Sequence, residues 1–253
     1  MTDHDKGLVR VEIGDDDVAV LTLADPDHRN ALSLDMARAI AAAVDEAVAA
    51  GVGALVLAAE PPVFCAGGSL DDLLEPKAPL PDTYVGMLAL ADAPVVTIAA
   101  VGGAAIGAGV NLPLVCDVVV ASPSARFDPR WLDVGIHPGG GHLWRLERSI
   151  GRQAAAALVL CGDRVDGREA ERLGLVYRCV GTDDELLPEA RRLAARAAGR
   201  SHPLVRRTKA TLRATVDQPD VATALAMELE AQEWSMAQPD FRERLLAIRQ
   251  RLA

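Results

Sequence analysis

The sequence has few aromatic residues and no long apolar run. Phe, Trp and Tyr make up 3% of the 253 residues, although half of the chain is hydrophobic. The core must therefore be built mainly from Ala, Val, Leu and Ile. No stretch of about 18 apolar residues is present, so no membrane span is expected. Charged residues make up 25% of the chain, as in ordinary globular proteins, which argues against extensive disorder.

Positive charge is scarce as well. The chain has 26 Lys and Arg against 36 Asp and Glu, and its net charge is −10. This balance argues against nucleic acid or an anionic lipid surface as a partner, although a local basic patch could still bind an anionic ligand. Residues 1–7 are polar, and no apolar segment typical of a signal peptide follows them. A cytoplasmic protein is therefore expected.

The cysteines are few and widely separated. Cys65, Cys116, Cys161 and Cys179 form no CxxC pair, so neither a metal site nor a redox motif is predicted. Each cysteine stands among apolar neighbours, which favours buried thiols.

Strand and helix patterns alternate through most of the chain. Leu8–Ile13 and Val18–Leu23 flank the turn residues GDDD and predict a hairpin. Ser33 is a suitable N-cap for a helix that ends near Gly51, and Ala54–Ala58 has the composition of a buried strand. This alternation predicts an α/β fold.

The alternation continues and then gives way to helices. Later elements are expected at Pro94–Val101 (strand), Ala105–Cys116 (helix), Asp117–Ala121 (strand), Gly139–Ile150 and Gln153–Cys161 (helices), Gly167–Leu173 (helix) and Tyr177–Val180 (strand). From Asp184 onward the pattern is helical. The sequence therefore predicts two regions, an α/β core over residues 1–200 and a helical region over residues 201–253.

Three glycine clusters stand out in the core region. They are Ala66-Gly67-Gly68, Gly102–Gly109 and Gly139–Gly141. Glycine lets a ligand approach the backbone, and a helix start offers unpaired N–H groups that can form an oxyanion hole. Turn chemistry and close helix packing are the alternative. Neither GxGxxG nor GxxxxGK[ST] is present, so nucleotide phosphate binding of those types is not supported.

Five segments carry a resemblance to a known family. In chain order they are RNALS, FCAGGSL, PVVTIAAVGGAAIGAGVNLPLVCDVVVAS, ARFDPRWLDVGIHPGGG and CGDRVDGREAERLGLVYRCV. Together they resemble the enoyl-CoA hydratase/isomerase (crotonase) family from about Val9 to Leu252. The resemblance implies a crotonase-like ββα spiral core with a C-terminal helical trimerisation region, in a homotrimer or a dimer of trimers.

The resemblance also implies an activity. Such a protein would be an acyl-CoA-processing enzyme, a lyase or isomerase of fatty acid metabolism. Coenzyme A would be part of the thioester substrate, and the protein would need no cofactor of its own and no metal. Two backbone N–H groups would stabilise the thioester oxyanion, and the family pattern assigns them to Ala66 and Ala108. Ala108 replaces the more usual glycine, and Ser69 stands where the family usually has an aspartate.

The acid/base residues of a hydratase are missing. The two glutamates of the family fall on Asn111 and Trp131, and the carboxylate of isomerase-like members falls on Gly139. General acid–base catalysis contributes about 10²–10⁴-fold per group, so efficient classical hydration is not expected. Isomerisation, hydration with a displaced acid/base, and hydrolysis remain open. The alternative is a non-catalytic acyl-CoA-binding protein.

Replacement acid/base groups are sought near the missing glutamates. His137 and Asp133 are the speculative candidates, and His142 is a further one. Their alternatives are structural: a histidine bonded to loop backbone, a loop-capping aspartate and a histidine in the first turn of a helix.

The remaining site residues are expected to contact the substrate. They are Arg29, Ala31, Cys65, Gly67, Leu70, Asn111, Trp131 and Gly139, and Arg251 is a further basic candidate for a neighbour's nucleotide. Arg29 and Arg251 have solvated surface positions as their alternative.

Overall fold

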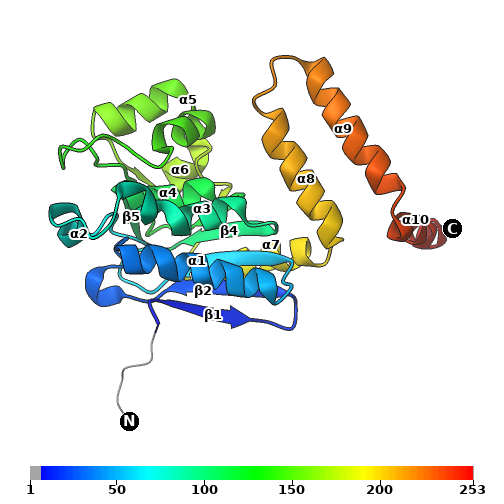
Figure 1. Cartoon of the computed structure of the whole chain (residues 1–253), viewed down its shortest axis with the longest axis horizontal. Helices are drawn as coiled ribbons and strands as arrows, with labels where there is room; N and C mark the ends of the chain where they lie inside the picture. Colours follow the sequence, from blue (N-terminus) through cyan, green and yellow to red (C-terminus); the bar gives the residue numbers. More distant parts are fainter. Residues whose placement is uncertain (1–6, 253) are drawn as a thin grey trace, which may run out of the picture. The chain divides into compact units, whose positions relative to one another are not determined.

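The computed structural model describes residues 7–252, which form two compact units that divide between Gly199 and Arg200 (Figure 1). The strands are β1 (Val9–Ile13), β2 (Val18–Leu23), β3 (Ala54–Ala59), β4 (Val96–Val101), β5 (Ala104–Ile106), β6 (Val118–Ala121), β7 (Arg126–Asp128), β8 (Val165–Asp166) and β9 (Arg178–Cys179). The helices of the first unit are η1 (Pro26–His28), α1 (Leu34–Ala49), α2 (Leu70–Leu74), η2 (Leu80–Tyr84), α3 (Val85–Asp92), η3 (Gly107–Val110), α4 (Asn111–Val115), α5 (His142–Leu160), α6 (Gly167–Leu173), η4 (Asp183–Glu185) and α7 (Leu186–Ala198).

A six-stranded sheet organises the first unit. Its strand order is β1-β2-β3-β4-β6-β9, and a smaller sheet has the order β5-β7-β8. The β1–β2 pair is antiparallel, as the predicted hairpin requires, and the remaining pairs of the large sheet are parallel. The predicted α/β class is therefore confirmed.

Both faces of the large sheet are buried. Alternate residues along a strand point to opposite faces, so Leu21 and Leu23 enter one core while Val18 and Val20 enter the other. α1 and α3 pack against each other beside the first core, and α7 covers β3 and β4 on the second (Figure 1). Burial on both faces explains why these strands are almost wholly apolar.

One expected element differs. The segment predicted as a helix from Ala105 to Cys116 begins as the short strand β5 and becomes helical only from Gly107. Pairing of Ala104–Ile106 with β7 decides this, because small residues of weak local preference follow the tertiary hydrogen bonds available to them.

The cysteine prediction is only partly correct. All four thiols are free, and Cys65 is buried. Cys116 and Cys179 are partly buried, whereas Cys161 is exposed because it follows the last residue of α5 at the surface. Val159, two residues earlier, is the side chain of this segment that enters the core.

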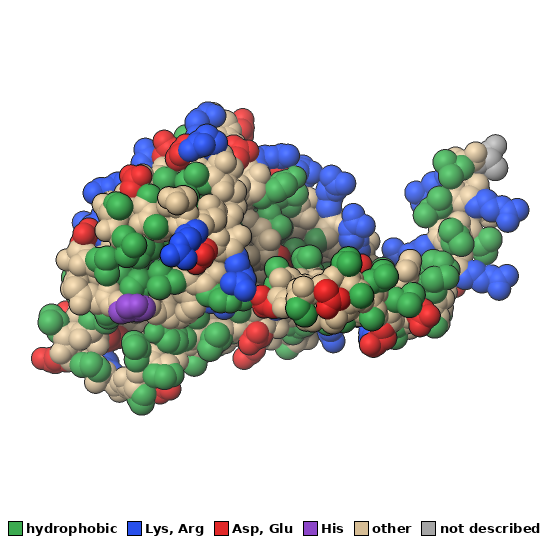
Figure 2. Space-filling view, turned by 90° about the horizontal axis from the view of Figure 1, so that it is seen from above, with side chains coloured by type: hydrophobic (Ala, Val, Ile, Leu, Met, Phe, Trp, Pro, Cys, Tyr) green, Lys and Arg blue, Asp and Glu red, His purple; other side chains and the backbone are tan. Residues whose placement is uncertain are grey.

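The second unit consists of helices alone. They are α8 (His202–Thr215), α9 (Val221–Met236) and α10 (Pro239–Leu252), and Arg207 of α8 bonds Glu230 of α9 over 2.7 Å. Most large apolar residues of α9 and α10 are exposed, and Figure 2 shows hydrophobic side chains beside charged ones along this part of the chain. No helix in residues 7–252 is long and apolar enough to cross a membrane.

Candidate active site

The loop from Phe64 to Ser69 is held in place by two isolated β-bridges. Cys65 donates to the Ala104 carbonyl at 3.0 Å and accepts from the Ile106 N–H at 2.9 Å. On its other side, Leu32 donates to the Gly67 carbonyl at 2.7 Å and accepts from the Ser69 N–H at 3.1 Å. The backbone of this loop is thus positioned by neighbours on both sides.

These bonds correct the assignment of the first oxyanion donor. The Ala66 N–H donates to the Arg29 carbonyl at 3.0 Å, so it is used inside the fold. In the bridge between Leu32 and Gly68, the flanking residues Gly67 and Ser69 make the hydrogen bonds, which turns the N–H of Gly68 away from Leu32. Among residues 7–252, the Gly68 N–H has no hydrogen-bond acceptor. The Gly67 N–H faces the buried thiol of Cys65, so Gly68 is the amide of the cluster that has no partner in the described part of the fold.

Ala108, the second predicted donor, has a backbone N–H without an internal partner in the part of the chain that the structure describes. Ala108 lies in the first turn of η3, where N–H groups have no helical carbonyl before them. No acceptor for the Ala108 N–H occurs among the described residues, while its carbonyl accepts from the Asn111 N–H. Alanine in place of the usual glycine keeps this N–H, because the group belongs to the backbone.

Two glycines bring the two segments together. A Cβ on Gly67 would lie 2.5 Å from the Ile106 carbonyl oxygen and 3.5 Å from the Ala108 nitrogen. A Cβ on Gly109 would lie 2.4 Å from the Cys65 carbonyl oxygen. Gly67 also has φ of 91°, a conformation that favours glycine. The glycines therefore serve close backbone packing, and that packing sets the Gly68 loop beside Ala108.

Ser69, in the position of the family aspartate, has a capping role. Its Oγ accepts from the Asp72 N–H at the start of α2. Asp72 Oδ2 in turn accepts from the Leu34 N–H at 2.9 Å, and Lys77 lies 3.0 Å from Oδ1. The bond from Leu34 holds the pKa of Asp72 below its usual value. These contacts join the loop to the beginning of α1.

Asn111, Trp131 and His142 form a cluster in which Asn111 and His142 are buried and Trp131 is partly buried. Asn111 Nδ2 donates to the Gly139 carbonyl at 3.1 Å, and its Oδ1 lies 2.8 Å from His142 Nδ1. The rings of Trp131 and His142 meet edge to face, with their centroids 5.5 Å apart. The two positions that lack glutamate are thus brought together around a histidine.

His142 is the first residue of α5 and is 1% exposed. Burial lowers the pKa of His142 to about 4, because a charged imidazole would lose its hydration there. The cluster is therefore uncharged at neutral pH. His142 was only a secondary candidate from sequence, where its position at a helix start gave no sign of its partners.

A tyrosine occupies the space beside Gly139. A Cβ at Gly139 would lie 2.6 Å from the Tyr84 hydroxyl oxygen, so glycine leaves room for this phenol. Tyr84 ends η2, a segment that carries none of the sequence motifs. The Tyr84 hydroxyl therefore lies where a side chain at position 139 would begin.

The two speculative acid/base residues lie elsewhere. His137 and Asp133 are both exposed, and neither is hydrogen-bonded to Asn111, Trp131 or His142. His137 Nδ1 lies 2.8 Å from the Pro138 carbonyl, which requires the imidazole to donate. The loop-bonding alternative therefore describes His137, and neither residue is a supported acid/base.

The residues expected to contact coenzyme A differ in exposure. Arg29 and Leu70 are exposed and Ala31 is partly buried, so all three are accessible. Cys65 is 0% exposed, and both of its backbone polar groups are bonded within the fold. Cys65 thus presents no accessible atom in this structure, and its contact with a ligand stays a prediction. Burial raises the pKa of its thiol to about 12, which also makes it unreactive.

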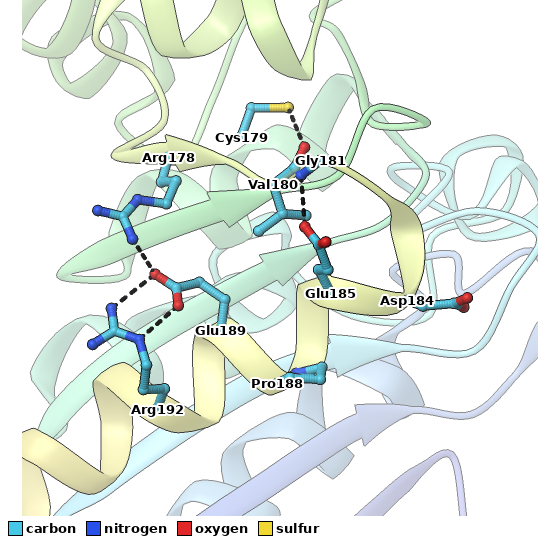
Figure 3. Close-up of a pocket in the computed structure, with 9 residues that line it drawn as sticks. All are labelled: Arg178, Cys179, Val180, Gly181, Asp184, Glu185, Pro188, Glu189 and Arg192. Atoms are coloured by element: carbon cyan, nitrogen blue, oxygen red, sulfur yellow. Dashed lines mark hydrogen bonds and ion pairs between the residues drawn. The ribbon is translucent and has the colours of Figure 1, made fainter.

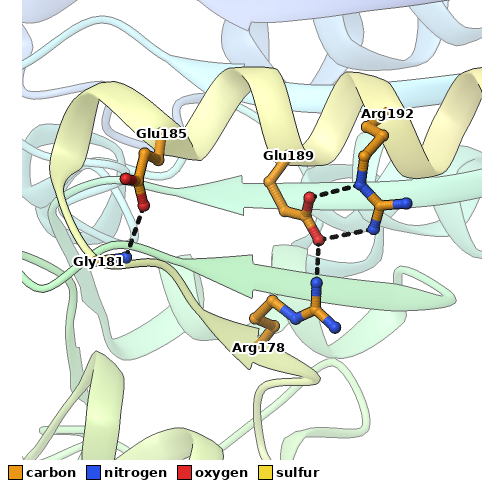
Figure 4. Close-up of polar contacts among 5 residues, drawn as sticks. All are labelled: Arg178, Gly181, Glu185, Glu189 and Arg192. Atoms are coloured by element: carbon orange, nitrogen blue, oxygen red, sulfur yellow. Dashed lines mark hydrogen bonds and ion pairs between the residues drawn. The ribbon is translucent and has the colours of Figure 1, made fainter.

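A surface pocket of about 540 Å³ lies between β9 and α7 (Figure 3). Glu189 on its wall accepts from Arg178 at 2.6 Å and from Arg192 at 2.7 and 2.9 Å (Figure 4). Glu185 accepts from the Gly181 N–H at 2.9 Å. The pocket's basic groups are thus already paired, and it shares no residue with the loops around Gly68 and Ala108.

The α/β core has the crotonase fold, as its similarity to solved enoyl-CoA hydratase structures shows. Residues 14–251 match the sequence profile of the family Enoyl-CoA hydratase/isomerase. The chain belongs to this family.

Individual relatives agree with the assignment. The probable enoyl-CoA hydratase EchA14 of Mycobacterium tuberculosis is 38% identical, over 99% of this chain and 100% of the relative. The enoyl-CoA hydratase structure from Bacillus anthracis has a TM-score of 0.90 at 27% identity, covering 96% of both chains. That from Mycobacterium smegmatis has a TM-score of 0.89 at 29% identity, covering 97% of both chains.

Proposed function

We propose that this chain binds an acyl-CoA thioester and stabilises its oxyanion with the N–H groups of Gly68 and Ala108. The observation that carries the proposal is the pair of unused amides on two segments pressed together at Gly67 and Gly109. Two N–H groups near one carbonyl oxygen favour the negative charge that develops there. Membership of the enoyl-CoA hydratase/isomerase family supports a thioester as the substrate.

We propose that the reaction does not follow the hydration mechanism that uses two glutamates. The amide of Asn111 and the indole of Trp131 cannot act as a general acid or base at neutral pH, and His142 is held neutral by burial. Isomerisation, hydrolysis and hydration with a different acid/base all use the same oxyanion hole. The absence of carboxylates at these two positions also favours a second candidate function, a non-catalytic acyl-CoA-binding protein.

Paired binding and turnover assays separate the two functions. Crotonyl-CoA, longer enoyl-CoAs and branched enoyl-CoAs should be titrated calorimetrically and assayed at the same enzyme concentration. Turnover of any thioester supports the enzyme, whereas saturable binding without turnover supports the binding protein. No binding of any thioester, with the protein folded, would overturn both.

The oxyanion hole is tested by replacing single backbone amides with esters. Glycolic acid at position 68 or lactic acid at position 108 removes one N–H and leaves the side chain unchanged. We expect kcat to fall about 10²–10³-fold for each. Lactic acid at position 66 is the matched control, because the Ala66 N–H is bonded to Arg29 inside the fold. Equal effects at all three positions would contradict the assignment.

We also propose that the second unit mediates a homotrimer or a dimer of trimers. The residues that support it are exposed apolar side chains of α9 and α10: Val221, Leu225, Leu229, Met236, Leu245, Ile248 and Leu252. Light scattering on the purified chain should give three or six times the monomer mass of 26.6 kDa. Replacing Leu225 and Leu229 by Ser should lower that mass, whereas a monomeric wild-type protein would contradict the proposal.

A further inference from the structure

The hydrogen bonds of Asn111 determine the proton position on His142. Asn111 Nδ2 donates to the Gly139 carbonyl, so the atom facing His142 is the acceptor Oδ1. His142 Nδ1 must therefore carry the proton, and in the neutral ring Nε2 is then an unprotonated acceptor. Burial keeps the ring neutral at physiological pH, because the pKa of His142 is lowered to about 4.

Two polar atoms of the cluster have no partner. His142 Nε2 and Trp131 Nε1 are both buried and make no hydrogen bond within the described residues. Buried polar groups in native proteins nearly always make hydrogen bonds, so two buried atoms without a partner require an explanation. One of these atoms is an acceptor and the other, the indole N–H, is a donor. Their rings are in edge-to-face contact.

The cluster is joined directly to the proposed oxyanion hole. Asn111 follows η3, and its N–H donates to the carbonyl of Ala108. The side chain that orients His142 thus begins one helical turn after the amide that would hold the thioester oxygen. Gly140, between Asn111 and the side chain of Met87, keeps this region free of a further side chain.

We propose that Trp131 Nε1–H and His142 Nε2 together bind one hydroxyl group, on the acyl chain of the thioester or on a water molecule beside it. The hydroxyl oxygen accepts from the indole, and its proton is donated to the imidazole. Asn111 is the positioning residue that fixes the imidazole tautomer. That this hydroxyl site lies at the acyl end of the substrate rests on the proposed function.

Trp131 Nε1 and His142 Nε2 would select a ligand according to whether it satisfies their hydrogen bonds. A group that both donates and accepts satisfies the two buried atoms, whereas a methylene group in the same place leaves both unpaired. Sites that bond a substrate hydroxyl discriminate strongly against analogues that lack it. The pair therefore favours hydroxyacyl thioesters over saturated ones, unless a water molecule supplies the hydroxyl.

The first arm of the test measures the Kd values of butyryl-CoA and of 2-, 3- and 4-hydroxybutyryl-CoA. We expect one hydroxyl isomer to bind at least tenfold more tightly than butyryl-CoA. Trp131→Phe and His142→Gln should each reduce that preference to near one. Trp144→Phe, on the exposed side of α5, and His202→Gln are the matched controls, and both should keep the preference.

The second arm needs no thioester. In the free protein, ¹⁵N NMR should show His142 protonated at Nδ1, and NOEs should detect water at the Trp131 indole N–H. Bound water with no hydroxyacyl preference assigns the hydroxyl to water. Protonation at Nε2, or no water and no preference, would overturn the inference. Failure of every thioester to bind would remove the proposed function, while the NMR result would still decide the hydroxyl site.

Discussion

The backbone N–H of Ala66 donates a hydrogen bond to the carbonyl oxygen of Arg29 over 3.0 Å. The bond spans two loops that precede α1 and α2, and it occupies an amide that the family pattern had assigned to catalysis. The neighbouring Gly68 amide remains free, two residues further along. A shift of two residues thus separates a structural amide from a proposed catalytic one.

Removal of the Ala66 N–H should affect stability more than chemistry. Lactic acid at position 66 should lower the free energy of unfolding by about 1 kcal/mol, the usual net contribution of one hydrogen bond. The kcat should stay within about twofold of wild type, because this N–H never faces the substrate. Urea unfolding and steady-state kinetics on the same preparation check both statements. A hundredfold loss of kcat with unchanged stability would return the catalytic role to Ala66.

Gly109→Ala should damage both the fold and the site. The added Cβ would lie 2.4 Å from the Cys65 carbonyl oxygen, so one of the two backbone segments must move. Overpacking of this kind costs about 1–3 kcal/mol of stability. Because Ala108 is adjacent, we expect kcat to fall more than tenfold.

The matched control for this change is Gly107→Asn. Gly107 has φ of 51°, which asparagine tolerates, and no atom lies within 4 Å of the position that a Cβ would take there. Thermal unfolding and turnover of this variant should remain near wild type. Equal damage from both substitutions would show that any side chain in η3 is harmful and that contact with Cys65 is not the cause.

His142 should make stability depend on pH in the acidic range. Its pKa is about 4 in the folded state and 6.5 for the unperturbed group, so the unfolded chain binds more protons between these values. Stability therefore decreases as pH falls from about 6.5 to 4. At about 1.4 kcal/mol per pKa unit, the loss approaches about 3 kcal/mol.

The measurement is the difference in unfolding free energy between wild type and His142→Gln at several pH values. Carboxylates with lowered pKa, such as Asp72 and Glu189, lose their contributions in both proteins and largely cancel in this difference. A difference that stays constant from pH 7 to pH 4 would show that His142 is not buried as a neutral group.

His137→Ala and Asp133→Asn should leave thioester binding and turnover unchanged. Both side chains are exposed, and His137 bonds only the Pro138 carbonyl of its own loop. Steady-state kinetics with the best thioester substrate provide the test, and thermal unfolding controls for altered folding. A tenfold or larger loss of kcat in either variant would restore that residue as an acid/base candidate.

The sequence by itself determined the α/β class, the hairpin, the helix that Ser33 caps and the family, because these depend on local periodicity, capping chemistry and motif order. It also located Asn111, Trp131 and Ala108. Only the tertiary structure decided which amide of the first glycine cluster is free, because the direction of an N–H depends on the bridges to Leu32 and Ala105. It alone joined His142 to Asn111 and Trp131, since residues 31 positions apart meet only when α4 and α5 pack together.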